Sequence, residues 1–270
     1  MMTANEIALE MIANFEKKPN PSAYFTKLDR QAIADGLKDR VKNPDLIQQG
    51  SKSSLCGPTA LVVTLARTRI TEYVKAVTGL YDFGTVRIGA MMGSERNLIP
   101  GRNAGWLISP RKDLLNYKPS SAIAEVDWII LASIRDSENW ALHYNDENNQ
   151  ASAITRGATL ASWMRNVGYT EVIEKTNNFF CKSATELQEA GRLYLDDYHV
   201  CLLIDANALY DGKTPDYYPN HWVILLSYID YAPFVGMDVL SWGERWKLPK
   251  SQMKLDEFLN YFYGYIAVKY

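Results

Sequence analysis

Only two scarce residue types in this sequence could supply a nucleophile and its base, cysteine and histidine, and each occurs three times. Cys56 stands out because the polar loop QQGSKSSL ends directly before it and the apolar stretch CGPTALVVTLA begins with it. This change predicts a helix that starts at or just after Cys56, with Pro58 in its first turn. Unpaired backbone N–H groups and the positive end of the helix dipole would favour a thiolate there. The alternative is a cysteine that merely packs beneath a helix start, and the local pattern favours neither.

The remaining cysteines and the histidines differ in how well their surroundings suit chemistry. Cys201 lies in the apolar run VCLLI and is expected to be a small core side chain, whereas Cys181 follows NNFF without a chemical signal. His143 falls near the end of an expected long helix, and His199 opens a buried strand. His221 begins HWVILLSYI after the turn-forming DYYPN, so a rigid strand would support it beside an open site. We expect His221 to be the base, with a surface histidine at a strand start as the alternative.

A carboxylate that accepts the second N–H of the imidazole would hold the ring in place. Asp238 is the first candidate, since an acid is unexpected in the strand-like GMDVLSW. Turn residues 230–233 separate this strand from the one that His221 begins, so the two strands are expected to lie side by side. Asp205, in LLIDAN, is the competing carboxylate and could equally cap a turn with Asn207.

Three stretches, QGSKSSLCGPTAL, NHWVILLSY and MDVLSWG, together resemble the papain-like cysteine peptidase superfamily, and within it the bacterial C39-like branch more than papain itself. The segment LASWMRNVGYTEV also resembles the helix, glycine and strand that precede the histidine there. The resemblance covers about residues 46–270. It implies Cys56 as nucleophile, His221 as base, Asp238 as orienting acid and Gln49 as oxyanion donor, with the adjacent Gln48 as the alternative donor.

Two departures from the papain pattern affect this expected site. The separation of Cys56 and His221 exceeds the roughly 130–150 residues typical of papain and cathepsins, which indicates an insertion in the 79–150 region. Papains carry Asn-Ser-Trp-Gly where this chain has Leu240-Ser241-Trp242-Gly243, so the expected asparagine is missing. Asp238, two residues before Leu240, would face the same side of a strand and could replace it.

The order of the expected elements is typical of an α+β protein. Helices are expected at 4–17, 22–40, 57–77 and 120–144, with irregular loops and a short strand in 79–118. A strand near 170–174, a helix at 184–192 and a group of antiparallel-looking strands follow. With the resemblance, this order implies a single papain-like domain over 1–270. It would have a helical extension at 1–45 and a catalytic core at 46–270, in which the Cys56 helix packs on a mainly antiparallel sheet.

Composition and missing motifs argue against several other kinds of function. GxxxxGK[ST], GxGxxG, HExxH and GxSxG are absent, so the common phosphate, dinucleotide, zinc-protease and serine-hydrolase signatures are missing. A formal charge of −2 gives no reason to expect nucleic acid as a partner, and three scattered histidines make no metal-ligand spacing. The apolar runs WIILA and WVILL are too short to span a bilayer. We therefore expect no cofactor, no metal, no nucleic acid and no membrane span.

The N-terminal stretch MMTANEIALEMIANFEKKPNP lacks the uninterrupted apolar core of a signal peptide. Three cysteines without a CxxC cannot form a complete disulfide scaffold. We expect a protein made in a reducing cytoplasm, which is compatible with export by a secretion system that reads no N-terminal signal.

The residues and the resemblance together predict a cysteine hydrolase, a peptidase or amidase that cleaves an amide bond of a peptide or protein. The same residues could catalyse deamidation or acyl transfer, as in a bacterial effector or toxin. An immunity or inhibitor protein would then be the partner. A non-catalytic binding module is the alternative of a different class, with some of the 17 tyrosines and 7 tryptophans lining a recognition groove.

Overall fold

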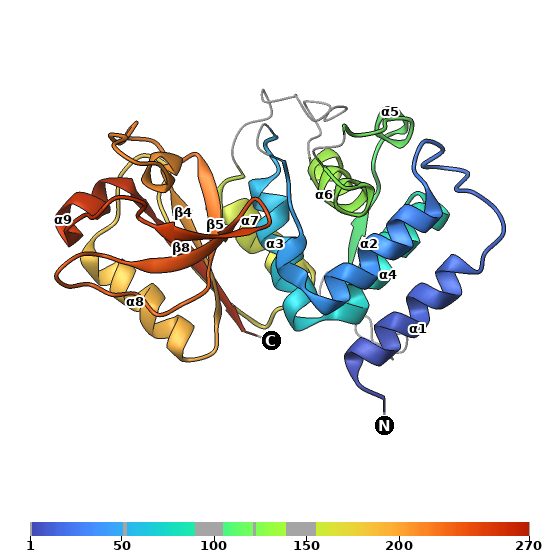
Figure 1. Ribbon diagram of the computed structural model, residues 1–270, viewed down its shortest axis with the longest axis horizontal. Coiled ribbons are helices and arrows are strands. Elements are labelled where there is room, and N and C mark those ends of the chain that lie inside the picture. The colour runs from blue at the N-terminus through green and yellow to red at the C-terminus, as the bar shows by residue number, and fades with distance from the viewer. Residues whose placement is uncertain (1, 51–52, 90–104, 121–122, 139–154, 270) are drawn as a thin grey trace. The chain divides into compact units, whose positions relative to one another are not determined.

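The structure is a computed structural model that describes residues 2–50, 53–89, 105–120, 123–138 and 155–269 of the 270-residue chain. It contains both helices and an antiparallel sheet, which confirms the expected α+β class. The chain divides into two compact units (Figure 1): unit 1 is Met1–Ala153 with Asn166–Gly168, and unit 2 is Ile154–Arg165 with Tyr169–Tyr270. None of the helices in the described residues is both long and apolar enough to cross a bilayer.

Unit 1 is a group of packed helices. The longer ones are α1 (Ala4–Glu16), α2 (Arg30–Lys42), α3 (Cys56–Thr68), α4 (Ile70–Phe83) and α6 (Glu125–Glu138). Shorter elements are the 3-10 helix η1 (Pro44–Leu46), the helix α5 (Lys112–Leu115) and the antiparallel strands β1 (Val86–Ile88) and β2 (Trp106–Ile108). Every residue of α3 from Cys56 to Ala66 is buried, as expected for a core helix.

Local capping decides where the helices of unit 1 begin and end. The Asp29 side chain accepts the N–H of Ala32, so α2 begins later than the expected helix at 22–40. The helix expected at 57–77 is two helices, because Arg69 leaves the helical backbone conformation with φ −144° and ψ 59°. Helix α1 packs on α2 and α4, and α2 packs on α6. The expected extension at 1–45 thus shares one unit with the Cys56 helix, and the single domain over 1–270 stays a prediction.

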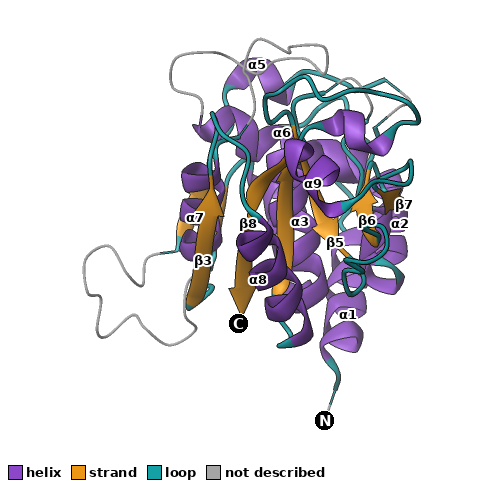
Figure 2. Cartoon of the chain, turned by 90° about the vertical axis from the view of Figure 1, so that its left-hand side faces the viewer, coloured by secondary structure: helices purple, strands orange, loops and turns teal. Residues whose placement is uncertain are grey.

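Unit 2 contains an antiparallel sheet whose described strands have the order β3-β8-β4-β5-β6-β7, seen from one side in Figure 2. The strands are β3 (Glu171–Thr176), β4 (His199–Ile204), β5 (His221–Leu225), β6 (Met237–Ser241), β7 (Glu244–Leu248) and β8 (Phe262–Lys269). The helical elements are α7 (Gly157–Asn166), α8 (Ala184–Leu195), α9 (Leu255–Phe258), η4 (Ala206–Leu209) and η5 (Leu259–Tyr261). Strand β7 was not expected from the sequence, because its mostly charged residues lack the alternation of apolar and polar side chains that identifies a strand.

The sheet buries one face under α8. Alternate residues of the central strands join the apolar side of α8 in one buried cluster, which includes Leu187, Leu193, Val200, Leu202, Val223, Leu225 and Val239. On the other face, Trp222 donates its ring N–H to the Thr155 carbonyl, 2.8 Å away and just before α7. Antiparallel pairing brings the end of β4, the start of β5 and the end of β6 to one edge of the sheet. The first residue of β5 at that edge is His221.

Candidate active site

Cys56 is the first residue of α3, as the sequence predicts. The residue is 5% exposed. The first hydrogen bond of the helix runs from the Thr59 N–H to the Leu55 carbonyl, 2.8 Å, so the N–H groups of Cys56 and Gly57 precede the first bonded turn. Leu55, at the N-cap, offers them no side-chain hydrogen bond. The positive end of the helix dipole therefore lies at the residue that carries the sulfur.

The loop before Cys56 holds Gln49 in a buried position. Gln49 is 3% exposed, whereas Gln48 is half-buried. The Ser53 hydroxyl donates to the Gln49 carbonyl at 2.5 Å. Gly50 has φ 76°, a left-handed conformation that glycine adopts without strain. The two candidate oxyanion donors thus differ in setting, and Gln49 is the more enclosed.

His221 is 5% exposed at the start of β5, and two residues fix its imidazole. The ring Nε2 lies 2.7 Å from the Oγ of Ser241, the last residue of β6. The Trp242 ring stacks on the imidazole, with ring centroids 4.6 Å apart and planes inclined by 17°. One ring nitrogen and one ring face are therefore engaged by neighbours within unit 2.

Trp242 reaches the imidazole from an unusual backbone conformation. Trp242 and Gly243 form the two-residue turn between β6 and β7, with φ values of 49° and 75°. Two successive positive φ angles are typical of a type I′ turn, in which a bulky residue is uncommon. The Trp242 ring also contacts Trp246 and Tyr210, at centroid distances of 5.3 and 6.4 Å. A conformation that is costly for tryptophan thus places its ring against His221.

Burial lowers the pKa of His221 to about 4, so the ring is neutral at pH 7. A neutral imidazole carries one N–H and one lone pair. If Nε2 holds the proton and donates it to Ser241, Nδ1 carries the lone pair that a general base needs.

The structure does not bring Asp238 to His221, which corrects the expected orienting acid. The Leu226 N–H donates to the Asp238 carbonyl at 2.8 Å. Asp238 is therefore level with the far end of β5, about 17 Å along the strand from His221 at about 3.3 Å per residue. Its carboxylate instead pairs with Arg245, 3.3 Å, and Lys247, 2.7 Å. In an antiparallel hairpin the start of the second strand meets the end of the first, so the end of β6 returns to His221.

The imidazole is therefore contacted by Ser241, whose role the sequence reasoning missed, and by Trp242. They match the Ser-Trp of the papain pattern Asn-Ser-Trp-Gly, whose asparagine position is Leu240 here. Leu240 pairs with Ile224 in the β5–β6 ladder and alternates in direction with Ser241. The signal that could have found Ser241 is the antiparallel register, which brings a residue near the end of β6 to the start of β5.

Asp205 caps a turn, which is the alternative that the sequence left open for it. The residue is fully buried at the end of β4. Its Oδ1 accepts the Asn207 N–H at 2.9 Å and its Oδ2 accepts the Asp216 N–H at 2.5 Å. The Asn220 N–H donates to the Ile204 carbonyl at 3.0 Å and fixes the residue before His221. These bonds shape the connection that leads into β5.

The other cysteines and histidines lie in different settings. Cys201 is fully buried in β4, which confirms the expected core side chain. Cys181 is an exposed thiol whose sulfur lies 3.3 Å from the Asn260 carbonyl. His199 opens β4, and His143 lies outside the described residues.

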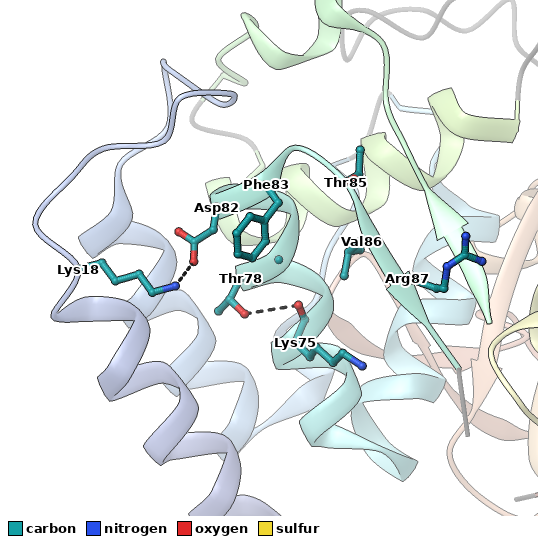
Figure 3. A pocket seen from close by; sticks show the side chains of 9 residues that line it. Lys18, Lys75, Thr78, Asp82, Phe83, Thr85, Val86 and Arg87 are labelled. Atoms are coloured by element: carbon teal, nitrogen blue, oxygen red, sulfur yellow. Dashed lines mark hydrogen bonds and ion pairs between the residues drawn. The ribbon is translucent and has the colours of Figure 1, made fainter. Parts of the chain in front are cut away.

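A separate hollow of about 340 Å³ lies on unit 1 and is lined mainly by α4 and β1 (Figure 3). Two of its lysines already have acidic partners: Lys18 lies 2.6 Å from Asp82, and Lys75 lies 3.7 Å from Glu72. It contains none of the predicted site residues. Within the described ranges, no group of three or more His, Cys, Asp or Glu side chains is arranged to hold a metal ion.

Comparison of the chain with protein-family models, with curated proteins and with solved structures found no match. A function must therefore be argued from the residues themselves.

Proposed function

We propose that this chain is a papain-like cysteine hydrolase that cleaves an amide bond, with Cys56 as the nucleophile and His221 as the base. The observation that carries the proposal is the His221 ring, which has Nε2 2.7 Å from Ser241 and one face stacked on Trp242. A ring held in this way keeps one orientation, as a general base requires. Cys56 adds support because it is the first residue of a helix, where a thiolate is stabilised.

In the proposed reaction the Cys56 thiol passes its proton to Nδ1 of His221, and the sulfur attacks the carbonyl carbon of the amide. The backbone N–H of Cys56 and the side-chain amide of Gln49 stabilise the oxyanion. The C–N bond breaks, His221 gives the proton to the leaving amine, and a thioester remains. Water gives a proton to His221 and attacks the thioester carbonyl. The C–S bond then breaks, the acid product leaves and the thiol regains its proton.

We assign the orienting role to Ser241 rather than to Asp238. A hydroxyl can fix the direction of the ring but does not set a negative charge against an imidazolium, as an aspartate does. The resting imidazole is therefore expected to be neutral, and it accepts the Cys56 proton as the sulfur attacks an electrophile. A peptide or protein amide as substrate follows from the papain-like resemblance alone.

Selective alkylation tests the pairing of Cys56 with His221 without knowledge of the substrate. Iodoacetamide is applied from about pH 5 to 9, and peptide mass spectrometry reads the rates at Cys56 and Cys181 in the same chain. Cys181 is the control because it is an exposed thiol. Cys56 is expected to react faster than Cys181 near pH 6 despite its 5% exposure, and His221→Ala should slow only Cys56, by about tenfold or more.

The outcomes separate the rival functions. Equal, ordinary reactivity of the two thiols, unaffected by His221→Ala, would overturn the proposal and favour a binding module. Ammonia release from a protein substrate without chain cleavage would show deamidation by the same residues. Turnover that survives Cys56→Ala would exclude Cys56 as the nucleophile.

A further inference from the structure

A buried ion pair in unit 1 lies directly beneath the loop that carries Gln48 and Gln49. Asp127, in the first turn of α6, is 0% exposed, and Arg40 of α2 is 8% exposed. The pair is bidentate, with 3.0 Å from Arg40 Nε to Asp127 Oδ1 and 2.6 Å from Nη2 to Oδ2. The same Oδ2 accepts the Gln48 N–H at 3.3 Å. One carboxylate thus links α2, α6 and the loop before Cys56.

Arg40 adds a second contact to the same connection. Its Nη2 donates to the Leu46 carbonyl at 3.4 Å, just before the loop, and its Nη1 donates to the Gly36 carbonyl at 3.4 Å within α2. The loop backbone is therefore held at Leu46 by the guanidinium and at Gln48 by the carboxylate.

The backbone around Gln49 is consequently fixed from both sides. On one side the Gln48 N–H bonds to Asp127, and on the other side the Gln49 carbonyl accepts the Ser53 hydroxyl at 2.5 Å. With both flanking groups engaged, the direction in which the Gln49 side chain leaves the backbone is set. A donor displaced by about 1 Å can cost about 100-fold in rate, so such fixing matters for an oxyanion site.

Stability alone is a weak reason to keep this pair. Two charges that are buried lose their hydration, and their mutual attraction offsets this loss only in part. Apolar residues of similar volume often give a core the same stability. Burial accordingly raises the pKa of Asp127, although the Arg40 guanidinium opposes that shift. A carboxylate offers what an apolar side chain cannot, which is an acceptor for the Gln48 N–H.

We infer that the Arg40–Asp127 pair is a positioning device for the oxyanion donor Gln49, an inference that rests on the proposed function. Neither residue touches the reacting atoms in this scheme. The pair acts through the loop backbone, so its loss should weaken stabilisation of the oxyanion while the nucleophilicity of Cys56 is kept.

Two reagents separate these effects at one sulfur. p-Nitrophenyl acetate acylates the thiolate through a tetrahedral oxyanion: the C–S bond forms, the C–O bond breaks and p-nitrophenolate leaves. Iodoacetamide alkylates the same sulfur by displacement of iodide, without an oxyanion. The ratio of the acylation rate to the alkylation rate at Cys56 therefore reports the oxyanion site, because a change in the sulfur alone alters both rates.

The test variant is Arg40→Met with Asp127→Leu, which removes both charges together. We expect the rate ratio to fall by about 10- to 100-fold, as for the loss of an oxyanion donor, with alkylation unchanged within about twofold. Gln49→Ala should lower the ratio to a similar extent. The ratio of the combined variant should fall no further, because both changes remove the same oxyanion donor from its position. Arg40→Gln with Asp127→Asn should recover part of the ratio, since an amide oxygen still accepts the Gln48 N–H.

The control is a second ion pair made by the same helix. Asp136 of α6 is 2% exposed and lies 3.4 Å from Arg111, and Arg111→Met with Asp136→Leu should leave the ratio unchanged. The inference is overturned if Arg40→Met with Asp127→Leu keeps the rate ratio of the parent protein. It is also overturned if the combination with Gln49→Ala lowers the ratio further than Gln49→Ala alone. If Cys56 of the parent protein reacts no faster than Cys181 with either reagent, the proposed function itself has failed.

Discussion

The Nε2 atom of His221 lies 2.7 Å from the Oγ atom of Ser241, and both side chains are buried at one edge of the antiparallel sheet. A serine in this place differs from a carboxylate because it carries no charge to stabilise an imidazolium. Burial lowers the pKa of His221 to about 4 in the same setting. Both features favour an imidazole that is neutral at rest and accepts a proton during the reaction. They do not favour a permanently charged imidazolium.

Ser241→Ala is expected to lower Cys56 acylation by p-nitrophenyl acetate by roughly tenfold, the equivalent of about one hydrogen bond that holds the ring. Ser241→Asn should retain most of the rate, because an amide oxygen can accept the ring N–H. Asp238→Asn is the matched control, and it should leave the rate unchanged because Asp238 pairs with Arg245 and Lys247. The reverse result, a loss with Asp238→Asn and none with Ser241→Ala, would return the orienting role to Asp238.

The buried neutral state of His221 predicts an acid-sensitive free energy of unfolding. The pKa is about 4 in the folded protein against 6.5 as the ordinary value, so the unfolded chain binds the extra proton between these pH values. The contribution of neutral His221 to the free energy of unfolding is complete above about pH 6.5. It is lost as the pH falls toward 4, by about 3 kcal/mol in all. Urea unfolding of Cys56→Ala and of Cys56→Ala with His221→Gln isolates this proton. The two curves should converge as the pH falls through that window, and parallel curves would contradict a buried neutral His221.

How far the sequence predicts this fold is visible at particular residues. The start of α3 at Cys56 was predictable, because a polar loop, Pro58 and an apolar run are all local signals. The break at Arg69 was not, since no proline or glycine marks it and the Arg69 guanidinium bonds to the carbonyl of the distant Val167. The alternation that identifies a strand fails in β7, whose sequence ERWKL is mostly charged and exposed.

The candidate site shows the same division between local and long-range information. Cys56 and His221 are recognisable from their own flanking residues, whereas the partner of His221 depends on which residues of β5 and β6 face each other. That register is fixed by the length of the connection between Leu225 and Met237, which includes an isolated bridge of Asp230 with Gly236. Counting residues from a motif selects Asp238, and only the paired strands select Ser241.

Trp242→Asn is expected to raise the pKa of His221 from about 4 toward its ordinary value of 6.5, because the ring that shields one face of the imidazole is lost. The fold should persist, since Asn-Gly is strongly preferred in a type I′ turn. Side-chain nitrogen resonances followed through a pH titration would give this pKa directly. Trp242→Phe keeps an aromatic ring over the imidazole and should keep the pKa low. An unchanged pKa in Trp242→Asn would mean that the sheet, and not this ring, dehydrates His221.

Asp205→Ala tests whether the second acid serves the fold or the chemistry. The carboxylate accepts two backbone N–H groups, at 2.9 and 2.5 Å, so its removal should lower the free energy of unfolding by about 2 kcal/mol or more. Asp205→Asn can replace one of the two bonds and should cost about half as much. These differences are measured by urea unfolding at neutral pH.

In the folded fraction, neither substitution of Asp205 should change the alkylation rate of Cys56 near pH 6 by more than about twofold. The reason is that Asn220 bonds independently to the Ile204 carbonyl, 3.0 Å, and to the Ala206 N–H, 2.7 Å, and so keeps the start of β5 in register. Ser241→Ala should show the opposite profile, with a small loss of stability and a clear loss of Cys56 reactivity. If Asp205→Asn abolished that reactivity at nearly parental stability, Asp205 would be the acid partner of His221 and the turn cap would be its secondary role.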